Sequence, residues 1–140
     1  MEALNVQGFR FFLCSVYRTW QVQENVMQEK IDLHLSEGHS PAEAKALAER
    51  IVAIPGISEH QLGLALDILP APELPDDGGL YAWLAENAHR FGFILRYPAD
   101  KTHITQIDYE PWHFRYVGLE AAQAIYQRRC CLEEYLEQTE

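Results

Sequence analysis

A histidine and an aspartate lie seven positions apart in the stretch SEHQLGLALDI, residues 58–68, with small residues between them. In a straight strand the side chains of His60 and Asp67 would point to opposite faces, so both can meet one ligand only if the chain bends between them. Gly63 is the residue that allows such a bend. Beyond it, large apolar residues alternate with small ones, which predicts that Asp67 lies on an uncrowded face with room for a ligand.

A second cluster, YEPWHFRYVG at 109–118, places Glu110 and His113 three positions apart across a proline. Proline disfavours helix for the residue before it, so this is not the helical HExxH arrangement. Two neutral imidazoles and one carboxylate suit zinc at about 2 Å and leave a position open for water. The residues therefore predict a catalytic zinc site with His60, Asp67 and His113 as ligands. Glu110 is then the natural general base.

The other histidines and the aromatic residues are interpreted as structural residues or as parts of the cleft wall, and none is assigned a catalytic role. Trp112 lies between the predicted base and a predicted ligand, so it is expected near the cleft, either in its wall or held by ring packing. The remaining histidines are interpreted as structural or surface residues: His34, His39, His89 and His103. The aromatic residues expected in the core are Trp20, Trp83, Phe91 and Phe93.

Three cysteines are too few for a disulfide framework, and their spacing includes no CxxC pair for zinc. We expect buried or incidental thiols at Cys14, Cys130 and Cys131. The alternative is one bridge from Cys14 to the C-terminal pair.

The length of 140 residues and the hydrophobic content of 48% predict one domain, residues 1–140, with a core of its own. A formal net charge of −10 without a basic stripe argues against a nucleic-acid partner. No stretch approaches the roughly 20 apolar residues of a membrane span, and the N-terminus lacks the pattern of an export signal. The chain enters an apolar run by Phe9 with almost no preceding structure, which is compatible with an N-terminally trimmed chain from which an export signal or anchor was removed.

Helices and strands are interspersed along the chain. Ser40 and Glu43 predict a capping box at the start of one helix. The expected strands are 9–17, 93–98 and 103–110, and the expected helices are 18–35, 40–56, 80–92 and 119–138, with a loop at 69–79. The hairpin expected over 93–110 favours an α+β fold with a mostly antiparallel sheet flanked by helices.

The stretches SEHQLGLALD, FGFILRYP and YEPWHFRYVG, with YRTWQVQ upstream, resemble the VanY-type D-alanyl-D-alanine carboxypeptidases. These are zinc peptidases of the M15 family that trim bacterial cell-wall peptides. The family pattern S-x-H-x-x-G-x-A-x-D falls without a gap on residues 58–67, and its second element falls on residues 110–113. The resemblance spans roughly residues 9–118. It implies a hedgehog/DD-peptidase-like fold and gives the zinc ligands and the base to the same residues as above.

The resemblance also implies roles for three polar residues. Arg18 and Gln23 would line the substrate cleft, with Arg18 stabilising the oxyanion. Ser58 would help to bind the terminal carboxylate of the substrate. The chain has Val16 where family members commonly have glycine before the tyrosine of YR, which affects the local turn and not the arginine.

By this resemblance the chain is a zinc carboxypeptidase that releases the C-terminal D-alanine from peptidoglycan stem peptides. Its implied location is the bacterial cell envelope or the extracellular space, although the chain itself carries no export signal or anchor. One alternative is an L,D-carboxypeptidase or a peptidoglycan endopeptidase with the same zinc site. An alternative of another class is a non-catalytic zinc-binding domain, which an intact Glu110 disfavours.

Overall fold

The computed structural model describes residues 1–73 and 78–138, so part of the predicted loop at 69–79 lies outside the described residues. The strands are β1 Phe11–Ser15, β2 Ala65–Pro70, β3 Phe93–Leu95 and β4 His113–Tyr116. The α-helices are α1 Glu2–Val6, α2 Trp20–Ser36, α3 Pro41–Glu49, α4 Leu80–Asn87, α5 Thr102–Thr105, α6 Leu119–Arg128 and α7 Leu132–Glu137. Short 3₁₀ turns are η1 Glu59–Leu62, η2 Ala88–Phe91 and η3 Ala99–Lys101.

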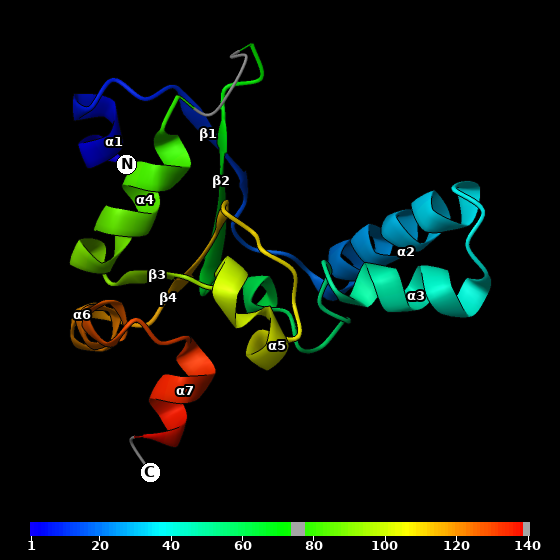
Figure 1. The fold of residues 1–140 in the computed structure, drawn as a ribbon. Coiled ribbons are helices and arrows are strands. Elements are labelled where there is room, and N and C mark those ends of the chain that lie inside the picture. Colours follow the sequence, from blue (N-terminus) through cyan, green and yellow to red (C-terminus); the bar gives the residue numbers. More distant parts are fainter. Residues whose placement is uncertain (74–77, 139–140) are drawn as a thin grey trace.

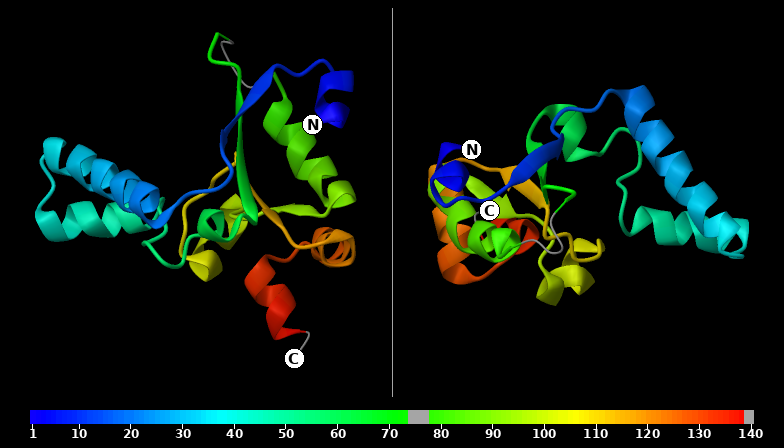
Figure 2. Two further views of the ribbon diagram at one scale, coloured as in Figure 1. Left: turned by 180° about the vertical axis from the view of Figure 1, so that it is seen from behind. Right: turned by 90° about the horizontal axis from the view of Figure 1, so that it is seen from above.

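The four strands form one antiparallel sheet in the order β1-β2-β4-β3 (Figure 1). The predicted α+β fold with a mostly antiparallel sheet is therefore confirmed. Helices α1, α4 and α6 lie on one side of the sheet and the α2–α3 hairpin on the other, as both views in Figure 2 show. Among the described helices, none combines the length and the apolar composition that crossing a membrane would require.

The two faces of the sheet differ because neighbouring residues of a strand point in opposite directions. Ile68 and Phe114 face α4 and belong to the main core, where Phe114 is 1% exposed. Their neighbours Asp67 and His113 therefore lie on the opposite face, toward the α2–α3 hairpin. This alternation places polar residues under the hairpin while the sheet keeps its apolar packing.

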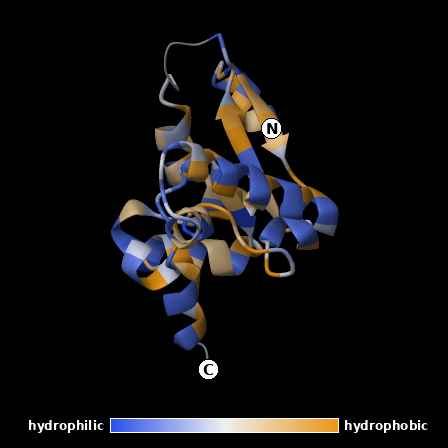
Figure 3. Cartoon of the chain, turned by 90° about the vertical axis from the view of Figure 1, so that its right-hand side faces the viewer, coloured by the Kyte–Doolittle hydropathy of each residue, from blue (hydrophilic) through white to orange (hydrophobic). Residues whose placement is uncertain are grey.

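The α2–α3 hairpin has a small core of its own, built from Met27, Ala48 and Val52. The predicted capping box is present: Ser40 accepts a hydrogen bond from the Glu43 amide, and the Glu43 carboxylate accepts from the Ser40 amide. Hydrophilic residues predominate on the helices of this hairpin, which face the viewer in Figure 3.

The predicted hairpin over 93–110 is wrong, because β3 pairs with β4 and not with residues 103–110. That segment forms α5 and then a coil, in which the Asp108 amide donates to the Arg50 carbonyl and the Glu110 amide to the Tyr97 carbonyl. Hydrogen bonds to distant segments thus replace the expected strand ladder.

The single C-terminal helix predicted over 119–138 is also wrong. Arg129 adopts a left-handed conformation, with φ of 53°, and separates α6 from α7. After the break, the first turn of α7 lies beside the segment that follows β3: Glu133 pairs with Arg96 and Glu134 with Lys101.

Two of the four aromatic residues expected in the core are exposed: Trp20 is 57% exposed and Phe91 48%. Trp83 and Phe93 pack against the main core. All three cysteines are free thiols, which contradicts the alternative of a disulfide; Cys14 is exposed and Cys131 buried.

Candidate metal centre and active site

Strand pairing brings two of the predicted metal ligands together. In the register of β2 with β4, Asp67 lies directly opposite His113, and in that of β1 with β2, Ser15 lies opposite Asp67. Directly opposed residues have Cβ atoms about 4.5–5.5 Å apart. Two residues that are 46 positions apart in the sequence thus lie side by side, and His113 Nδ1 is 3.0 Å from Asp67 Oδ1.

The third predicted ligand reaches the same point through a tight turn. His60 lies in η1, which Gly63 ends in a left-handed conformation with φ of 66°. This is the bend that the sequence predicted. The Nδ1 of His60 lies 3.0 Å from the Val16 carbonyl, so the protonated Nδ1 donates to that oxygen and the lone pair is left on Nε2. Nε2 lies 3.3 Å from Asp67 Oδ2.

His60, Asp67 and His113 form a group that could hold a metal ion. One ligand atom from each lies within 4.8 Å of the other two, and all three residues are buried. The two imidazole rings meet edge to face, with centroids 5.0 Å apart. Two imidazoles and a carboxylate in a protected position are a donor set that zinc prefers.

The electrostatics of the group favour positive charge inside it. Burial alone would raise the pKa of Asp67, but hydrogen bonds with His113 and His60 hold it well below its usual range. Burial would lower the pKa of His113, yet its hydrogen bonds to Asp67 and Glu59 raise it to about 9. A cation bound between these side chains would supply the positive charge that the carboxylates stabilise.

Glu110 lies beside this group without being part of it. Its Oε2 is 3.8 Å from His113 Nδ1, and the residue is 5% exposed. Burial, opposed in part by the charge of His113, raises the pKa of the Glu110 carboxyl to about 7. A carboxylate with a pKa near neutrality suits a group that takes up and releases protons. Asp108, the carboxylate two residues before Glu110, is instead partly exposed and pairs with Arg50.

Arg18 is held in place by three side chains. Its Nη2 donates to Asp67 Oδ2 at 2.9 Å, its Nε to Ser15 Oγ at 2.7 Å and its Nη1 to Gln23 Oε1 at 3.3 Å. Gln23 is fully buried and donates in turn to the Ala53 carbonyl. A guanidinium carries five N–H groups, so an arginine fixed by three of them can still offer donors to a substrate oxygen.

All eight predicted site residues line one cavity of about 140 Å³: Arg18, Gln23, Ser58, His60, Asp67, Glu110, Trp112 and His113. Trp112 thus forms part of the wall, one of the two positions considered for it. A larger cavity of about 400 Å³ beside α6 contains none of these residues. We locate the chemistry in the smaller cavity because the histidines and carboxylates converge there.

Sequence reasoning missed one carboxylate that lines this cavity, that of Glu59, whose side chain is 11% exposed. Its Oε2 lies 3.4 Å from Nε2 of His113, and its Oε1 accepts from Arg96 at 2.7 Å and pairs with Arg115 at 3.0 Å. Burial opposes ionisation, but these partners lower the pKa of Glu59 to about 2. Arg96 also binds Glu133 through two nitrogens. The only sequence signal was the position of Glu59 beside a predicted ligand.

A buried His-Asp-His group with a nearby carboxylate of raised pKa is the arrangement of a metal-dependent hydrolase. Comparison with known proteins identifies the family. The model of the VanY D-alanyl-D-alanine carboxypeptidases matches residues 1–119, and this chain belongs to that family.

Among curated relatives, the D-alanyl-D-alanine carboxypeptidase of Enterococcus faecalis is 50% identical over 135 residues. The match covers 96% of this chain but 50% of that relative, so the chain spans about half the length of the curated protein.

Two solved structures share the fold. One is VanYB in complex with D-alanine-D-alanine, with a TM-score of 0.95 and 49% identity, covering 99% of this chain and 77% of that one. The other is a mutant of the D,D-pentapeptidase VanY from a VanB-type vancomycin-resistance cassette, in complex with Zn(II). It has a TM-score of 0.91 and 50% identity, and the match covers 96% of this chain and 76% of that one.

Proposed function

We propose that this chain is the catalytic domain of a zinc-dependent D-alanyl-D-alanine carboxypeptidase that releases the C-terminal D-alanine from peptidoglycan stem peptides. The observation that carries the proposal is the convergence of His60, Asp67 and His113 on one point beside Glu110. Family membership and the Zn(II) and D-alanine-D-alanine complexes of related proteins support it. A substrate of this kind places the protein at the bacterial cell envelope.

His60, Asp67 and His113 would hold the zinc ion, which would supply Lewis acidity toward a carbonyl oxygen and would lower the pKa of water. Glu110 accepts the proton of the attacking water and then passes it to the leaving amine of D-alanine. Arg18 donates hydrogen bonds to the oxygen on which negative charge develops. Ser58 orients the substrate in the cavity, and Gln23, which is bonded to Arg18 and to the Ala53 carbonyl, holds the arginine in position.

The test is to incubate the zinc-loaded protein with stem pentapeptide ending in D-alanyl-D-alanine and with the tetrapeptide that lacks the last residue, and to weigh the products. Loss of one alanine from the pentapeptide alone is the expected result. Cleavage of the tetrapeptide alone would indicate an L,D-carboxypeptidase. Zinc binding without any cleavage would indicate a binding domain. Metal-free protein is the control for both substrates.

Arg18→Ala is expected to reduce kcat by about 10²–10³-fold, the range for loss of one oxyanion donor. Ser58→Ala is expected to act mainly on KM, because that side chain is assigned to ground-state binding. Since Arg18 also contacts Asp67, zinc content is measured in both variants. An Arg18→Ala protein with raised KM and unchanged kcat would assign the arginine to substrate binding instead.

Glu59→Gln is expected to weaken zinc binding by about 10–100-fold, the usual effect of removing the partner that orients a ligating histidine. The carboxylate contacts His113 and is itself held by Arg96. Competition with a chelator measures the affinity, and exposed Glu29→Gln is the matched control. An unchanged zinc affinity together with a lowered melting temperature would show that Glu59 stabilises the fold through its ion pairs and does not orient His113 for zinc binding.

A further inference from the structure

The end of α2 forms a Schellman motif that determines which side chains meet there. Gly38 has φ of 94°, its amide donates to the Leu35 carbonyl at 3.1 Å, and the His39 amide donates to the His34 carbonyl at 3.2 Å. In this motif the residue two positions after the cap contacts the residue three before it, usually through apolar side chains. Here both positions hold histidine.

The two imidazoles and the cap residue form a second cluster of metal-ligating groups. The rings of His34 and His39 lie 5.9 Å apart in an edge-to-face arrangement. The carboxylate of Glu37 lies 2.8 Å from Nδ1 of His34. One ligand atom from each of the three residues lies within 4.8 Å of the others.

One ring nitrogen of His34 makes no hydrogen bond to the described residues. Its side chain is 14% exposed, and its Nε2 is buried without a hydrogen-bond partner among the described residues. Because Glu37 lies on Nδ1, this nitrogen is the one that faces the cluster, and the unpartnered Nε2 means that the hydrogen bonds of the ring fix it from the Nδ1 side alone. The cluster also lies at a helix C-terminus, where the partial negative charge of the carbonyls favours a cation.

We propose that His34, Glu37 and His39 bind a second divalent transition-metal ion, of the zinc and copper class. Two imidazoles with one carboxylate select these metals over calcium and magnesium. Zinc at about 2.0–2.1 Å from each ligand in tetrahedral geometry needs ligand atoms about 3.3 Å apart. The Glu37 side chain, half exposed, and exposed His39 can rotate to reach that spacing. Their exposure makes this site weaker than the buried one.

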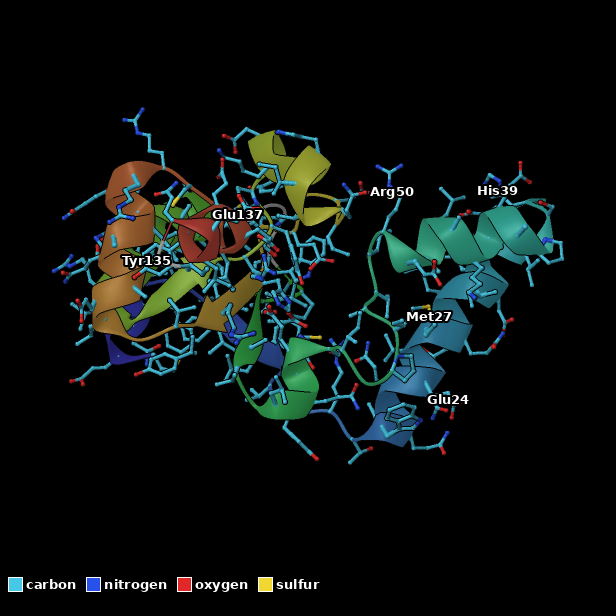
Figure 4. The ribbon with its side chains drawn as sticks, turned by 90° about the horizontal axis from the view of Figure 1, so that it is seen from below. Glu24, Met27, His39, Arg50, Tyr135 and Glu137 are labelled. Carbon is cyan, nitrogen blue, oxygen red and sulfur yellow. The ribbon has the colours of Figure 1, made fainter. Side chains whose placement is uncertain are left out.

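The position of the site separates it from the catalytic cavity. His39 lies at the end of the α2–α3 hairpin that is far from the sheet, and Arg50 marks the near end (Figure 4). The near end contributes Gln23, Val26 and Ile51 to the wall of the cavity. A metal ion at the far end would join the last turn of α2 to the start of α3, and would thereby stabilise the hairpin that forms this wall.

The test is zinc stoichiometry by equilibrium dialysis at increasing free zinc. Wild-type protein is expected to bind a first equivalent tightly and a second more weakly, with a melting temperature that rises again as the second binds. His39→Gln, at an exposed position, is expected to abolish the second equivalent and its thermal shift while retaining the first. His103→Gln removes another exposed histidine and is the matched control, expected to bind two.

A wild-type protein that binds one equivalent, or a His39→Gln protein that keeps two, would overturn the proposal. Loss of the second equivalent in His103→Gln as well would place that ion elsewhere. The assignment of the catalytic zinc site is tested separately. His113→Ala is expected to lose the first zinc equivalent and to keep the second.

Discussion

Replacement of Glu110 by glutamine is expected to lower kcat by about 10²–10⁴-fold, which corresponds to roughly 3–5 kcal/mol of activation free energy. Glutamine keeps the size of the side chain and removes the oxygen that accepts the proton of water. Burial already disfavours the ionised form of this carboxyl and raises its pKa to about 7, so the neutral amide should cost little stability. Zinc content and melting temperature are therefore expected to stay near the wild-type values.

Asp108→Asn is the control for Glu110→Gln, because Asp108 is the nearest alternative carboxylate in the sequence and pairs with Arg50 outside the cavity. It is expected to retain activity within about threefold, since it contributes no proton transfer. Loss of zinc together with activity in Glu110→Gln would make Glu110 a ligand or the support of one. Retained activity in Glu110→Gln would require a different base.

His113→Ala is the second change with a large expected effect. It removes one of three buried ligands, and because losing only a partner of a ligand costs about 10–100-fold in metal affinity, losing the ligand itself should cost more than about 100-fold. Peptidase activity should fall with zinc occupancy. Metal analysis after dialysis measures the occupancy, and hydrolysis of the stem pentapeptide measures the activity.

The effect of a chelator on the melting temperature is compared between the wild type and His113→Ala. A ligand that binds only the folded state stabilises it by RT ln(1 + [L]/Kd), so a chelator should lower the melting temperature of the wild type. The same chelator should have little effect on His113→Ala when free zinc is too low to fill the site at the hairpin tip. Full zinc occupancy and full activity in His113→Ala would refute the ligand assignment.

Local sequence signals predicted elements whose causes lie within a few residues. The capping box of Ser40 and Glu43 and the bend at Gly63 were both predicted, and both are present. The capping box depends on side chains that bond to the backbone three positions away, and the bend depends on a glycine that tolerates positive φ. The register that sets Asp67 opposite His113 depends instead on which strands pair across 46 positions.

The incorrect predictions concern segments whose partners are distant in sequence. Residues 103–110 have the composition of a strand, but their backbone groups bond to Arg50 and Tyr97, while β4 occupies the place beside β3. The C-terminal segment has the pattern of one helix, but Arg129 breaks it so that Glu133 reaches Arg96. Tertiary hydrogen bonds and ion pairs outweigh weak local propensities in both places.

The sequence by itself determined the chemical groups of this protein: the spacing of two histidines and an aspartate, a nearby glutamate and the family pattern around them. Only the tertiary structure decided that Glu59 lies beside His113 and that His34 meets His39 at a helix end. The physical reason is that side-chain identity is local information, whereas burial and the distance between ligand atoms arise when the sheet, the 3₁₀ turn and the hairpin pack together.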